Sequence, residues 1–479
     1  MLLINLFKNI KYIKTKGQTN VNVKHLCQNF NKIQEGSLFF CYKGNSCDGH
    51  DLAIKVKEKG AVALVVEKFL DVDLPQILVK NTRKIMPKVC NNFFDNVLKK
   101  VKIIGVTGTN GKTTTSHMIY NLLNLNGLKS GLIGTNGAKY LNKVIDVGLT
   151  TPDTTDLFYI LDDMTSCGIK YVVMEVSAHS LYFNKLYGIK FEIGIFTNLS
   201  QDHLDFFGDM HKYALCKLKF LKKFYCKKCL INIDDDYGSF FYKLSNSKVY
   251  SYSIENPADF FAQNIQLNIN NSSFTANLLD DVINIQSNFP CKFNVYNLLS
   301  ALSCCKLLDI DLTSISLNVK KLDKIDGRMN FYLLKNGSSV VIDFAHTPDG
   351  LEKVLLNLKQ LKFNSKIISV FGCGGDRDKS KRSKMGEIAT VLSDKVIITS
   401  DNPRNEDALS IIKNITSNIT KNNYEIEVDR KKAILKAISI SSQGDIILIA
   451  GKGAEIYQEI KGKKIPFSDK NIIANFVEK

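Results

Sequence analysis

Short apolar runs that each end in a polar or glycine-rich loop recur along most of the chain. They are VKIIGVTGTNG (101–111), SGLIGTNG (130–137), YVVMEVSAHS (171–180), FEIGIFTNLSQDH (191–203), KIISVFGCGGDRD (366–378), KVIITSDNPR (395–404) and DIILIAGKGAE (445–455). Uninterrupted apolar runs are typical of parallel strands covered on both faces, and helical stretches follow them here. In such sheets, ligands bind beyond the carboxyl ends of the strands, which is where these polar loops fall.

The pattern predicts an α/β protein with three domains. The chain has 479 residues, and about 150 residues per domain is the usual ratio. We expect an N-terminal domain over 1–98, a central domain over 99–327 and a C-terminal domain over 328–479. The last boundary precedes SSVVIDFAHTPDG (338–350), where the alternation of strands and loops begins again.

Composition narrows the class of protein only slightly. With 44% hydrophobic and 23% charged residues, the chain resembles an ordinary globular protein. The net charge of +17 comes from dispersed lysines, so we expect no nucleic-acid partner. Lys8 interrupts the first apolar run after seven residues, which is too short for a signal peptide or a membrane span. The twelve cysteines lack zinc-ribbon spacing and indicate reduced thiols. We therefore expect a cytoplasmic protein without membrane insertion.

The strongest single motif follows the apolar run that begins at Val101. Glycines let the backbone approach phosphate oxygens, a helix N-terminus supplies free N–H donors, and a lysine neutralises the β- and γ-phosphates. The spacing departs from GxxxxGK[ST], because Val106 takes the place of the first glycine. No Asn-Lys pair continues as NKxD, which disfavours a GTPase. The predicted phosphate loop consists of Gly108, Thr109, Asn110, Gly111, Lys112, Thr113 and Thr114.

Nine motifs in order resemble one family. They are GTNGKTT (108–114), MEVSAHSL (174–181), FTNLSQDHLDFFGDM (196–210), FNVYN (293–297), GRMN (327–330), DFAHTPDGLE (343–352), VFGCGGDRDKSKR (370–382), SDNPR (400–404) and GKGAE (451–455). Together they resemble the Mur ligases, and among them those that add the third amino acid of the peptidoglycan stem peptide. The resemblance implies a uridine-binding N-terminal domain, a central P-loop ATPase domain with a parallel sheet and a Rossmann-like C-terminal domain.

The resemblance also implies a chemistry. The γ-phosphoryl group of ATP passes to a substrate carboxylate, and an amine then attacks the acyl phosphate. Thr113 and Glu175 would hold one Mg²⁺, and His203 would help to hold a second. Lys217 matches the family's carbamylated lysine, whose modification requires a neutral amine. The alternative for Lys217 is that it is one surface lysine in a cluster. The alternative for His203 is a structural role, because a lone histidine is more often structural than a metal ligand.

Further ligand contacts are implied by the same resemblance. Asn294, Arg328 and Asp343 match residues near ATP, although either FNVYN asparagine could instead cap a helix. The contacts implied for UDP-MurNAc-L-Ala-D-Glu are Phe30, Thr150, Thr151, Ser177 and Lys185. The N-terminal match is the weakest, because Asn29-Phe30-Asn31 stands where relatives have Asp-Ser-Arg.

The incoming amino acid is inferred from the DNPR motif. An arginine at 404 could pair bidentately with the distal carboxylate of meso-diaminopimelate, which lysine lacks. Glu455 suits an ammonium group, and the alternative for Arg404 is an exposed loop arginine. The implied diaminopimelate contacts are Arg377, Asp401, Asn402, Pro403, Arg404, Gly451 and Glu455.

Other functions stay open at this point. A lysine-adding or D-Ala-D-Ala-adding Mur ligase, or a folylpolyglutamate synthetase, would share most motifs, but DNPR with GGDRDKSKR disfavours them. A P-loop regulatory ATPase would share the phosphate loop without needing Glu175, His203 and Lys217 together. We expect a monomeric ligase of peptidoglycan synthesis that uses ATP and Mg²⁺.

Overall fold

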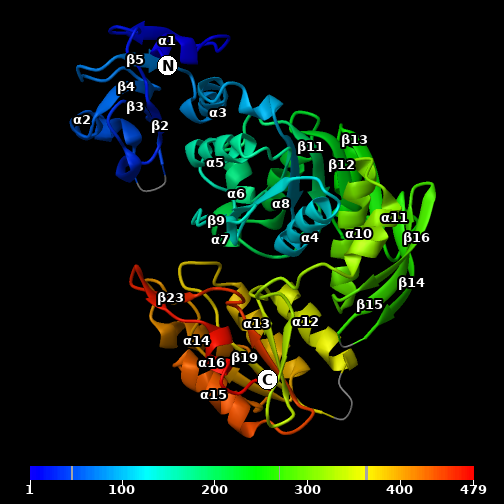
Figure 1. Ribbon diagram of the computed structural model, residues 1–479. Helices are drawn as coiled ribbons and strands as arrows, with labels where there is room; N and C mark the ends of the chain where they lie inside the picture. Colours follow the sequence, from blue (N-terminus) through cyan, green and yellow to red (C-terminus); the bar gives the residue numbers. More distant parts are fainter. Residues whose placement is uncertain (45–46, 269, 362–364, 479) are drawn as a thin grey trace.

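The structure is a computed structural model that describes residues 1–44, 47–268, 270–361 and 365–478. Three sheets follow one another along the chain and stack in the order of the sequence, with the C-terminal sheet farthest from the N-terminus (Figure 1). No helix in these four ranges combines the length and apolar character that a bilayer span requires. The expected α/β class with three sheet-containing regions is confirmed.

The N-terminal sheet has five strands in the order β1-β5-β4-β3-β2, and only β1 is antiparallel to its neighbour. Its central strand β4 carries the apolar run AVALVV. The strands are β1 (Lys14–Lys16), β2 (His25–Cys27), β3 (Ser37–Phe40), β4 (Ala61–Val66) and β5 (Gln76–Leu78), and the helices are α1 (Leu3–Leu6), α2 (Ala53–Glu58) and α3 (Thr82–Phe93).

The central sheet has eleven strands in the order β16-β15-β14-β13-β12-β11-β6-β10-β7-β8-β9, and the seven from β14 to β7 pair in parallel. The strands are β6 (Lys102–Thr107), β7 (Ser130–Gly134), β8 (Gly137–Tyr140), β9 (Lys143–Ile145), β10 (Tyr171–Glu175), β11 (Phe191–Phe196), β12 (Cys226–Asn232), β13 (Lys248–Ser253), β14 (Phe260–Leu267), β15 (Ser272–Leu278) and β16 (Asp281–Ser287). Strand β6, which lies between β11 and β10, leads directly into the phosphate loop.

Helices cover both faces of the central sheet, as the buried apolar strands require. One core packs α4, α10 and α11 against the sheet, and the core on the other face includes residues of α5 and α8. The helices are α4 (Lys112–Leu125), α5 (Thr154–Ser166), α6 (Ala178–Tyr182), α7 (Leu204–Phe207), α8 (Met210–Phe220), α9 (Gly238–Leu244), α10 (Lys292–Leu307) and α11 (Leu312–Val319).

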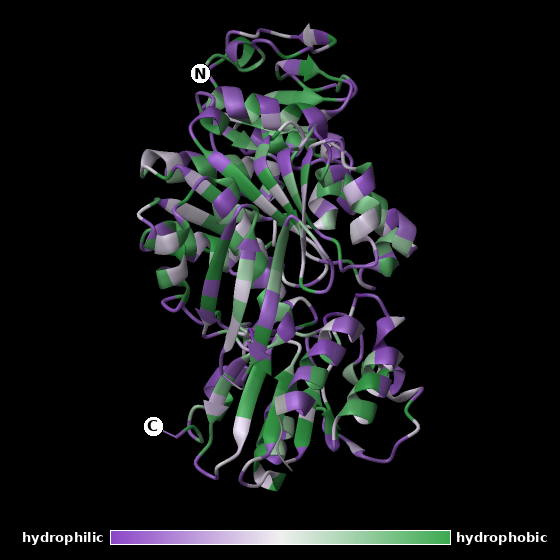
Figure 2. Ribbon diagram, turned by 90° about the vertical axis from the view of Figure 1, so that its right-hand side faces the viewer, coloured by the Kyte–Doolittle hydropathy of each residue, from purple (hydrophilic) through white to green (hydrophobic). Residues whose placement is uncertain are grey.

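The C-terminal sheet has the order β17-β18-β22-β19-β20-β21, with parallel pairing from β18 onward. Its hydrophobic strands lie inside a layer of helices (Figure 2). The strands are β17 (Asn330–Leu333), β18 (Ser339–Asp343), β19 (Ile367–Phe371), β20 (Lys395–Ile398), β21 (Tyr424–Ile426) and β22 (Ile446–Ala450), with a hairpin of β23 (Tyr457–Ile460) and β24 (Lys463–Pro466). The helices are α12 (Pro348–Leu361), α13 (Lys381–Leu392), α14 (Ala408–Thr416), α15 (Arg430–Ile440) and α16 (Asp469–Ile473).

Candidate active site

The phosphate loop joins β6 to α4 at the carboxyl edge of the central sheet. Gly111 has a φ of +82°, and a Cβ there would lie 2.6 Å from Asn297 Oδ1, so the position requires glycine. No side chain caps α4, so its first N–H groups remain available to an anion. Lys112 Nζ donates to the carbonyl oxygens of Gly108 and Thr109 at 3.0 and 2.8 Å. The loop thus combines backbone donors with one ammonium, which suits a triphosphate.

Two hard oxygen donors meet beside this loop. Glu175 ends β10, the parallel neighbour of β6, and its side chain is buried. The Thr113 hydroxyl donates to Glu175 Oε2 at 3.0 Å, while Thr135 donates to the same carboxylate through its N–H and its hydroxyl. Thr114 is buried in the first turn of α4. The pair of Thr113 and Glu175 fits Mg²⁺, which takes few protein ligands and otherwise phosphate and water oxygens.

A preformed cage of acidic, histidine or cysteine ligands is absent from the part of the chain that the structure describes. This finding agrees with the sparse site just described, because a Mg²⁺ bound with a nucleotide relies on phosphate oxygens. The twelve cysteines are all free thiols, and most are buried. Cys226 and Cys229 lie in the core of the central domain, as expected for reduced structural thiols.

Lys217 lies fully buried against the phosphate loop. Asp209 caps α8 by accepting from Lys212 N, which sets the helix that carries Lys217 inward. Lys217 Nζ donates to Gly108 O at 2.7 Å and lies 4.8 Å from the centre of the Tyr213 ring. Burial lowers the pKa of Lys217 well below its usual value, and the charge of the phosphate loop's lysine adds to the effect. A neutral amine at this position is what carbamylation requires.

His203 lies next to Tyr213, the aromatic neighbour of Lys217. It adopts a left-handed conformation with a φ of +57° before α7. Burial lowers its pKa to about 3, against the opposing charge of Asp202. Its Nε2 lies 3.3 Å from Asp202 Oδ2. A neutral imidazole is the form that binds metal ions, so the expected role of His203 is chemically reasonable.

The predicted ATP contacts of the third domain reach the phosphate loop from across the domain junction. Arg328 donates to the Thr113 hydroxyl at 3.1 Å, and its guanidinium lies 4.5 Å from the centre of the Phe344 ring. Burial raises the pKa of Asp343, whose carboxylate accepts from the backbone N–H of Met329 and Ala345. Arg328 thus reaches the Thr113 hydroxyl of the phosphate loop from the third domain.

Asn294 lies in the first turn of α10, where hydrogen bonds hold its side chain and it lines a small cavity. Its Nδ2 donates to Pro290 O at 2.8 Å, and Asn297 Nδ2 donates to Asn294 Oδ1 at 3.2 Å. Asn294 and Arg328 line one small cavity together with Phe289. Asn110 points the other way, toward the C-terminal domain, and donates to Asp349 Oδ2 at 2.8 Å. The predicted ATP residues therefore gather around one junction.

Four of the predicted nucleotide-sugar contacts gather on the other side of Glu175. The Thr151 hydroxyl donates to Glu175 O at 2.8 Å and to Ser177 Oγ at 3.2 Å. Thr150 Oγ1 lies 3.1 Å from Thr135 Oγ1. The other two are Ser177, which caps α6, and Lys185, whose Nζ lies 2.7 Å from Asp153 Oδ1.

Phe30 lies apart from this group in the N-terminal domain. It belongs to a short 3-10 turn (Phe30–Lys32), and Lys59 Nζ lies 4.0 Å from the centre of its ring. Asn29 caps this turn by accepting from Asn31 N. The residues that replace the family's Asp-Ser-Arg thus form a self-contained turn, and the role of Phe30 stays a prediction.

The predicted amino-acid contacts surround the loop after β20. Arg404 adopts a φ of +53°, donates to Gly375 O at 2.7 Å and pairs with Glu459 Oε2 at 3.1 Å. Asn402 Nδ2 donates to Glu455 Oε2 at 2.8 Å. Pro403 is buried and Arg377 is exposed. The loop after β20 therefore brings the Arg404 guanidinium near Glu455 of the loop after β22, through the contact of Asn402 with that carboxylate.

Gly451 and Asp401 hold this loop against β22. A Cβ on Gly451 would lie 2.7 Å from Asp401 Oδ2, so the close approach requires glycine. Lys452, which sequence reasoning missed, is fully buried and donates to Asn402 Oδ1 and Glu455 Oε2 at 3.0 and 2.8 Å. Its place inside GKGAE was the available signal. Lys452 neutralises Glu455, so this carboxylate is already paired.

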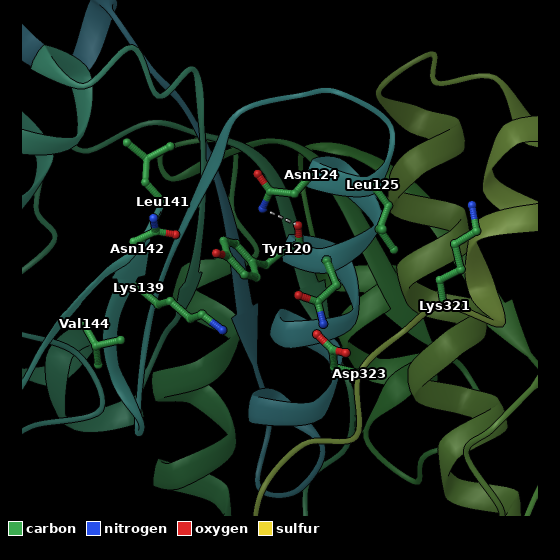
Figure 3. Close-up of a pocket in the computed structure, with 10 residues that line it drawn as sticks. Tyr120, Asn124, Leu125, Lys139, Leu141, Asn142, Val144, Lys321 and Asp323 are labelled. Atoms are coloured by element: carbon green, nitrogen blue, oxygen red, sulfur yellow. Dashed lines mark hydrogen bonds between the residues drawn. The ribbon is translucent and has the colours of Figure 1, made fainter.

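One open cavity of about 540 Å³ lies away from all of these residues. It lies between the C-terminal half of α4, the β8–β9 hairpin and the link to the third domain (Figure 3). Tyr120, Asn124, Lys139 and Lys321 are among its lining residues. None of the predicted site residues lines it, so the candidate site is recognised by its chemistry and not by the size of a cavity.

The fold and these neighbouring groups define an enzyme that uses a nucleoside triphosphate in a phosphate-loop domain flanked by two α/β domains. Residues 31–97 match the catalytic domain of the Mur ligase family, 106–305 match the Mur ligase middle domain, and 327–453 match the Mur ligase glutamate ligase domain. The chain belongs to the Mur ligase family and is an ATP-dependent, amide-bond-forming ligase.

Individual relatives agree with this assignment. The chain is 41% identical to UDP-N-acetylmuramoyl-L-alanyl-D-glutamate--2,6-diaminopimelate ligase 1 of Clostridium acetobutylicum, over 100% of this chain and 99% of the relative. It is 40% identical to the diaminopimelate ligase of Clostridium perfringens over 100% of both chains. A solved structure of a diaminopimelate ligase is 30% identical, has a TM-score of 0.70 and covers 99% of this chain and 98% of its own.

Proposed function

We propose that this chain adds meso-diaminopimelate to the D-Glu γ-carboxylate of UDP-MurNAc-L-Ala-D-Glu in peptidoglycan precursor synthesis. The named substrates of its full-length relatives support this reaction. The structural observation that carries the proposal is the meeting of the DNPR and GKGAE loops, where Asn402 donates to Glu455 and the charges of Arg404 and Glu455 are held in pairs with Glu459 and Lys452. A diamino diacid carries both matching charges, with a distal carboxylate that lysine lacks.

The chain's own residues would divide the work as follows. Lys112 and the N-terminus of α4 hold the phosphates of ATP, and Arg328 approaches from the third domain. Thr113 and Glu175 would hold Mg²⁺, and His203 with a carbamylated Lys217 would hold a second ion. The bound ions neutralise charge on the transferring phosphoryl group. Closure of the third domain over this site would exclude water from an acyl phosphate, which water would otherwise hydrolyse.

The nucleotide-sugar substrate fits the opposite side of Glu175. Thr151 and Ser177 present hydroxyls there, and Lys185 presents an ammonium. These groups suit a carboxylate and a diphosphate. We further propose three domains over 1–98, 99–327 and 328–479, a monomer, and a cytoplasmic reaction without nucleic-acid or membrane partners.

The proposal is tested by measuring phosphate release from ATP in the presence of UDP-MurNAc-L-Ala-D-Glu. We expect release to depend on meso-diaminopimelate and L-lysine to be used at least about 10³-fold less efficiently. The Arg404→Lys variant keeps the charge but loses the bidentate geometry. We expect it to raise the KM for diaminopimelate about 10²-fold while the KM for ATP stays within threefold.

Preference for L-lysine would contradict the proposed amino acid and favour a lysine-adding ligase. Release that depends on neither amino acid would contradict the ligase reaction and favour a regulatory ATPase. The matched control is Lys413→Met, which removes a charge from α14 without touching the DNPR loop. We expect this control to leave the KM values for ATP, UDP-MurNAc-L-Ala-D-Glu and diaminopimelate within twofold of the wild type.

A further inference from the structure

A buried cluster of charge spans the junction between the central and C-terminal domains. Asp202 precedes His203 in the central domain, and Lys381 begins α13 in the C-terminal domain. Lys381 Nζ lies 3.4 Å from Asp202 Oδ1, and His346 Nε2 lies 3.9 Å from Asp202 Oδ2. The side chains of Lys381 and Asp202 are only 6% and 8% exposed. Two residues 179 positions apart therefore bury opposite charges against each other.

Burial of this pair depends on the position of the C-terminal domain. A buried ammonium or carboxylate is costly unless it is paired and hydrogen-bonded. If the two domains separated, both charges would return to water. The contact is therefore a feature of the closed arrangement.

Asp202 links this contact to the predicted metal site. Its Oδ1 accepts from the backbone N–H of His203 at 3.0 Å, and its Oδ2 lies 3.3 Å from His203 Nε2. His203 adopts a left-handed conformation that is uncommon for residues other than glycine. The His203 ring lies 6.1 Å from the Tyr213 ring between centroids, and the Tyr213 hydroxyl lies 3.4 Å from Thr109 Oγ1 of the phosphate loop. Asp202 thus holds the His203 backbone and faces its ring.

Lys381 is also tied to the amino-acid loops of its own domain. Its neighbour Arg382 is fully buried and donates to both oxygens of Glu406, at 2.9 and 3.0 Å. Glu406 in turn accepts from Asp376 N at 2.7 Å, and Arg404 donates to the carbonyl oxygen of the preceding residue, Gly375. The start of α13 and the DNPR loop are therefore joined by hydrogen bonds within the C-terminal domain.

We propose that Lys381 is a positioning residue for phosphoryl transfer. When the C-terminal domain closes, the Lys381 ammonium pairs with Asp202 and fixes its carboxylate, and Asp202 orients His203 at the phosphate end of the ATP site. The ion pair of Lys381 with Asp202 thereby connects the amino-acid-binding loops to the phosphate site. The inference rests on the proposed function and assigns roles to Lys381 and Asp202 within it.

The test compares Lys381→Met, Asp202→Asn and the double variant in the full chain. Met keeps the length of the buried stem and removes the charge. We expect each single change to lower kcat about 10²-fold, because small displacements of positioned groups cost that much, with the KM for ATP within threefold. The double variant should be no slower than the slower single variant, since both changes break one contact. Lys381→Arg should recover part of the loss.

Lys384→Met is the matched control. Lys384 lies on the same helix and also crosses the junction, donating to Gln201 Oε1 at 2.5 Å, but this contact is exposed. We expect its kcat within twofold of the wild type. A Lys381→Met variant with kcat within threefold of the wild type, or losses that multiply in the double variant, would overturn the proposal.

X-ray scattering separates this inference from the proposed function. With a non-hydrolysable ATP analogue, Lys381→Met should have a larger radius of gyration than the wild type. A wild-type chain that shows no turnover with diaminopimelate counts against the proposed function alone. Equal radii for the wild type and Lys381→Met overturn the role of Lys381 whether or not turnover is seen.

Discussion

The central domain is attached to its two neighbours by different kinds of contact. On the N-terminal side, one apolar core runs across the junction without a break. The rings of Phe94 and Tyr159 meet edge to face there with centroids 4.9 Å apart, and Leu26 N donates to the Tyr159 hydroxyl. On the C-terminal side, Cys291 and Phe293 join the apolar core of the third domain, while the contacts beside the phosphate loop are polar, such as those of Asn110 with Asp349 and of Asp202 with Lys381. The first junction we call the apolar junction, and the second the polar junction.

The difference between the two junctions indicates which domain can change position when ligands bind. Apolar burial is favourable whether or not a ligand is bound, so the N-terminal domain needs none to stay in place. Buried ion pairs roughly balance their desolvation cost. The open and closed arrangements at the polar junction are therefore close in free energy. Binding of phosphate, metal and amino acid can then decide the position of the C-terminal domain. Residues of the polar junction should govern catalysis, and residues of the apolar junction should govern stability.

The largest expected effect comes from Lys217, beside the polar junction. We expect Lys217→Ala to reduce diaminopimelate-dependent phosphate release by at least about 10³-fold, because the proposed second metal ion would lose its proposed anionic ligand. The free energy of unfolding should not show a correspondingly large loss, because removing a buried amine also removes the cost of desolvating it. The measurement is a steady-state phosphate assay with and without added formate or acetate. Full activity without these carboxylates would refute a carbamylated Lys217.

The apolar junction is broken by Phe94→Ala. We expect a loss of about 3 kcal/mol in the free energy of unfolding, as for other buried phenylalanines, while kcat at saturating substrates stays within threefold. Chemical denaturation and the phosphate assay together measure both quantities. Phe240→Ala is the control, because Phe240 is an exposed ring on α9. A Phe94→Ala variant that loses kcat but not stability would reverse the assignment of the two junctions.

Acid should act on the polar junction through partly buried histidines. Burial lowers the pKa of His117 to about 4, and the charges of Lys139 and Arg328 add to the effect. The unfolded chain binds this proton near pH 6.5, so the contribution of His117 is complete above that pH and is lost as pH falls toward 4. The loss is at most about 3 kcal/mol. His346, with a pKa of about 4, acts in the same direction.

The pH effect is measured by denaturation between pH 4 and pH 7. We expect His117→Gln to lose less stability over this interval than the wild type, whereas the exposed His211→Gln should follow the wild type. Asp235 acts in the opposite direction, because burial raises its pKa to about 6. An identical slope for His117→Gln and the wild type would show that His117 does not contribute.

The smallest expected effect belongs to an exposed ion pair at the apolar junction. Lys32 Nζ lies 2.8 Å from Asp156 Oδ2 and links the N-terminal domain to α5. We expect Lys32→Ala to cost less than about 1 kcal/mol, because solvent screens exposed pairs. Lys57→Ala, which removes a pair with Asp73 inside the N-terminal domain, should behave alike. A loss of several kcal/mol for Lys32→Ala alone would mean that charge, and not apolar burial, holds this junction.

Much of the fold followed from local chemistry. The apolar runs at β6, β10, β19 and β22 became buried parallel strands, and the phosphate loop lies at the junction of β6 and α4. These features depend on residues close together in the chain, so the sequence pattern was sufficient to predict them. The motifs were likewise sufficient to recognise the family. The roles assigned to Glu175, His203 and Lys217 remain predictions.

The sequence by itself determined which strands form, which loop receives a phosphate and which family the chain joins, because short-range hydrophobic spacing and backbone freedom govern those features. Only the tertiary structure decided the neighbours of each charged group. Nothing local shows that Lys381 meets Asp202, that Lys452 neutralises Glu455, or that Lys217 is buried against Gly108. Burial and pairing of charge depend on elements far apart in the chain, and they set the pKa values and contacts on which catalysis depends.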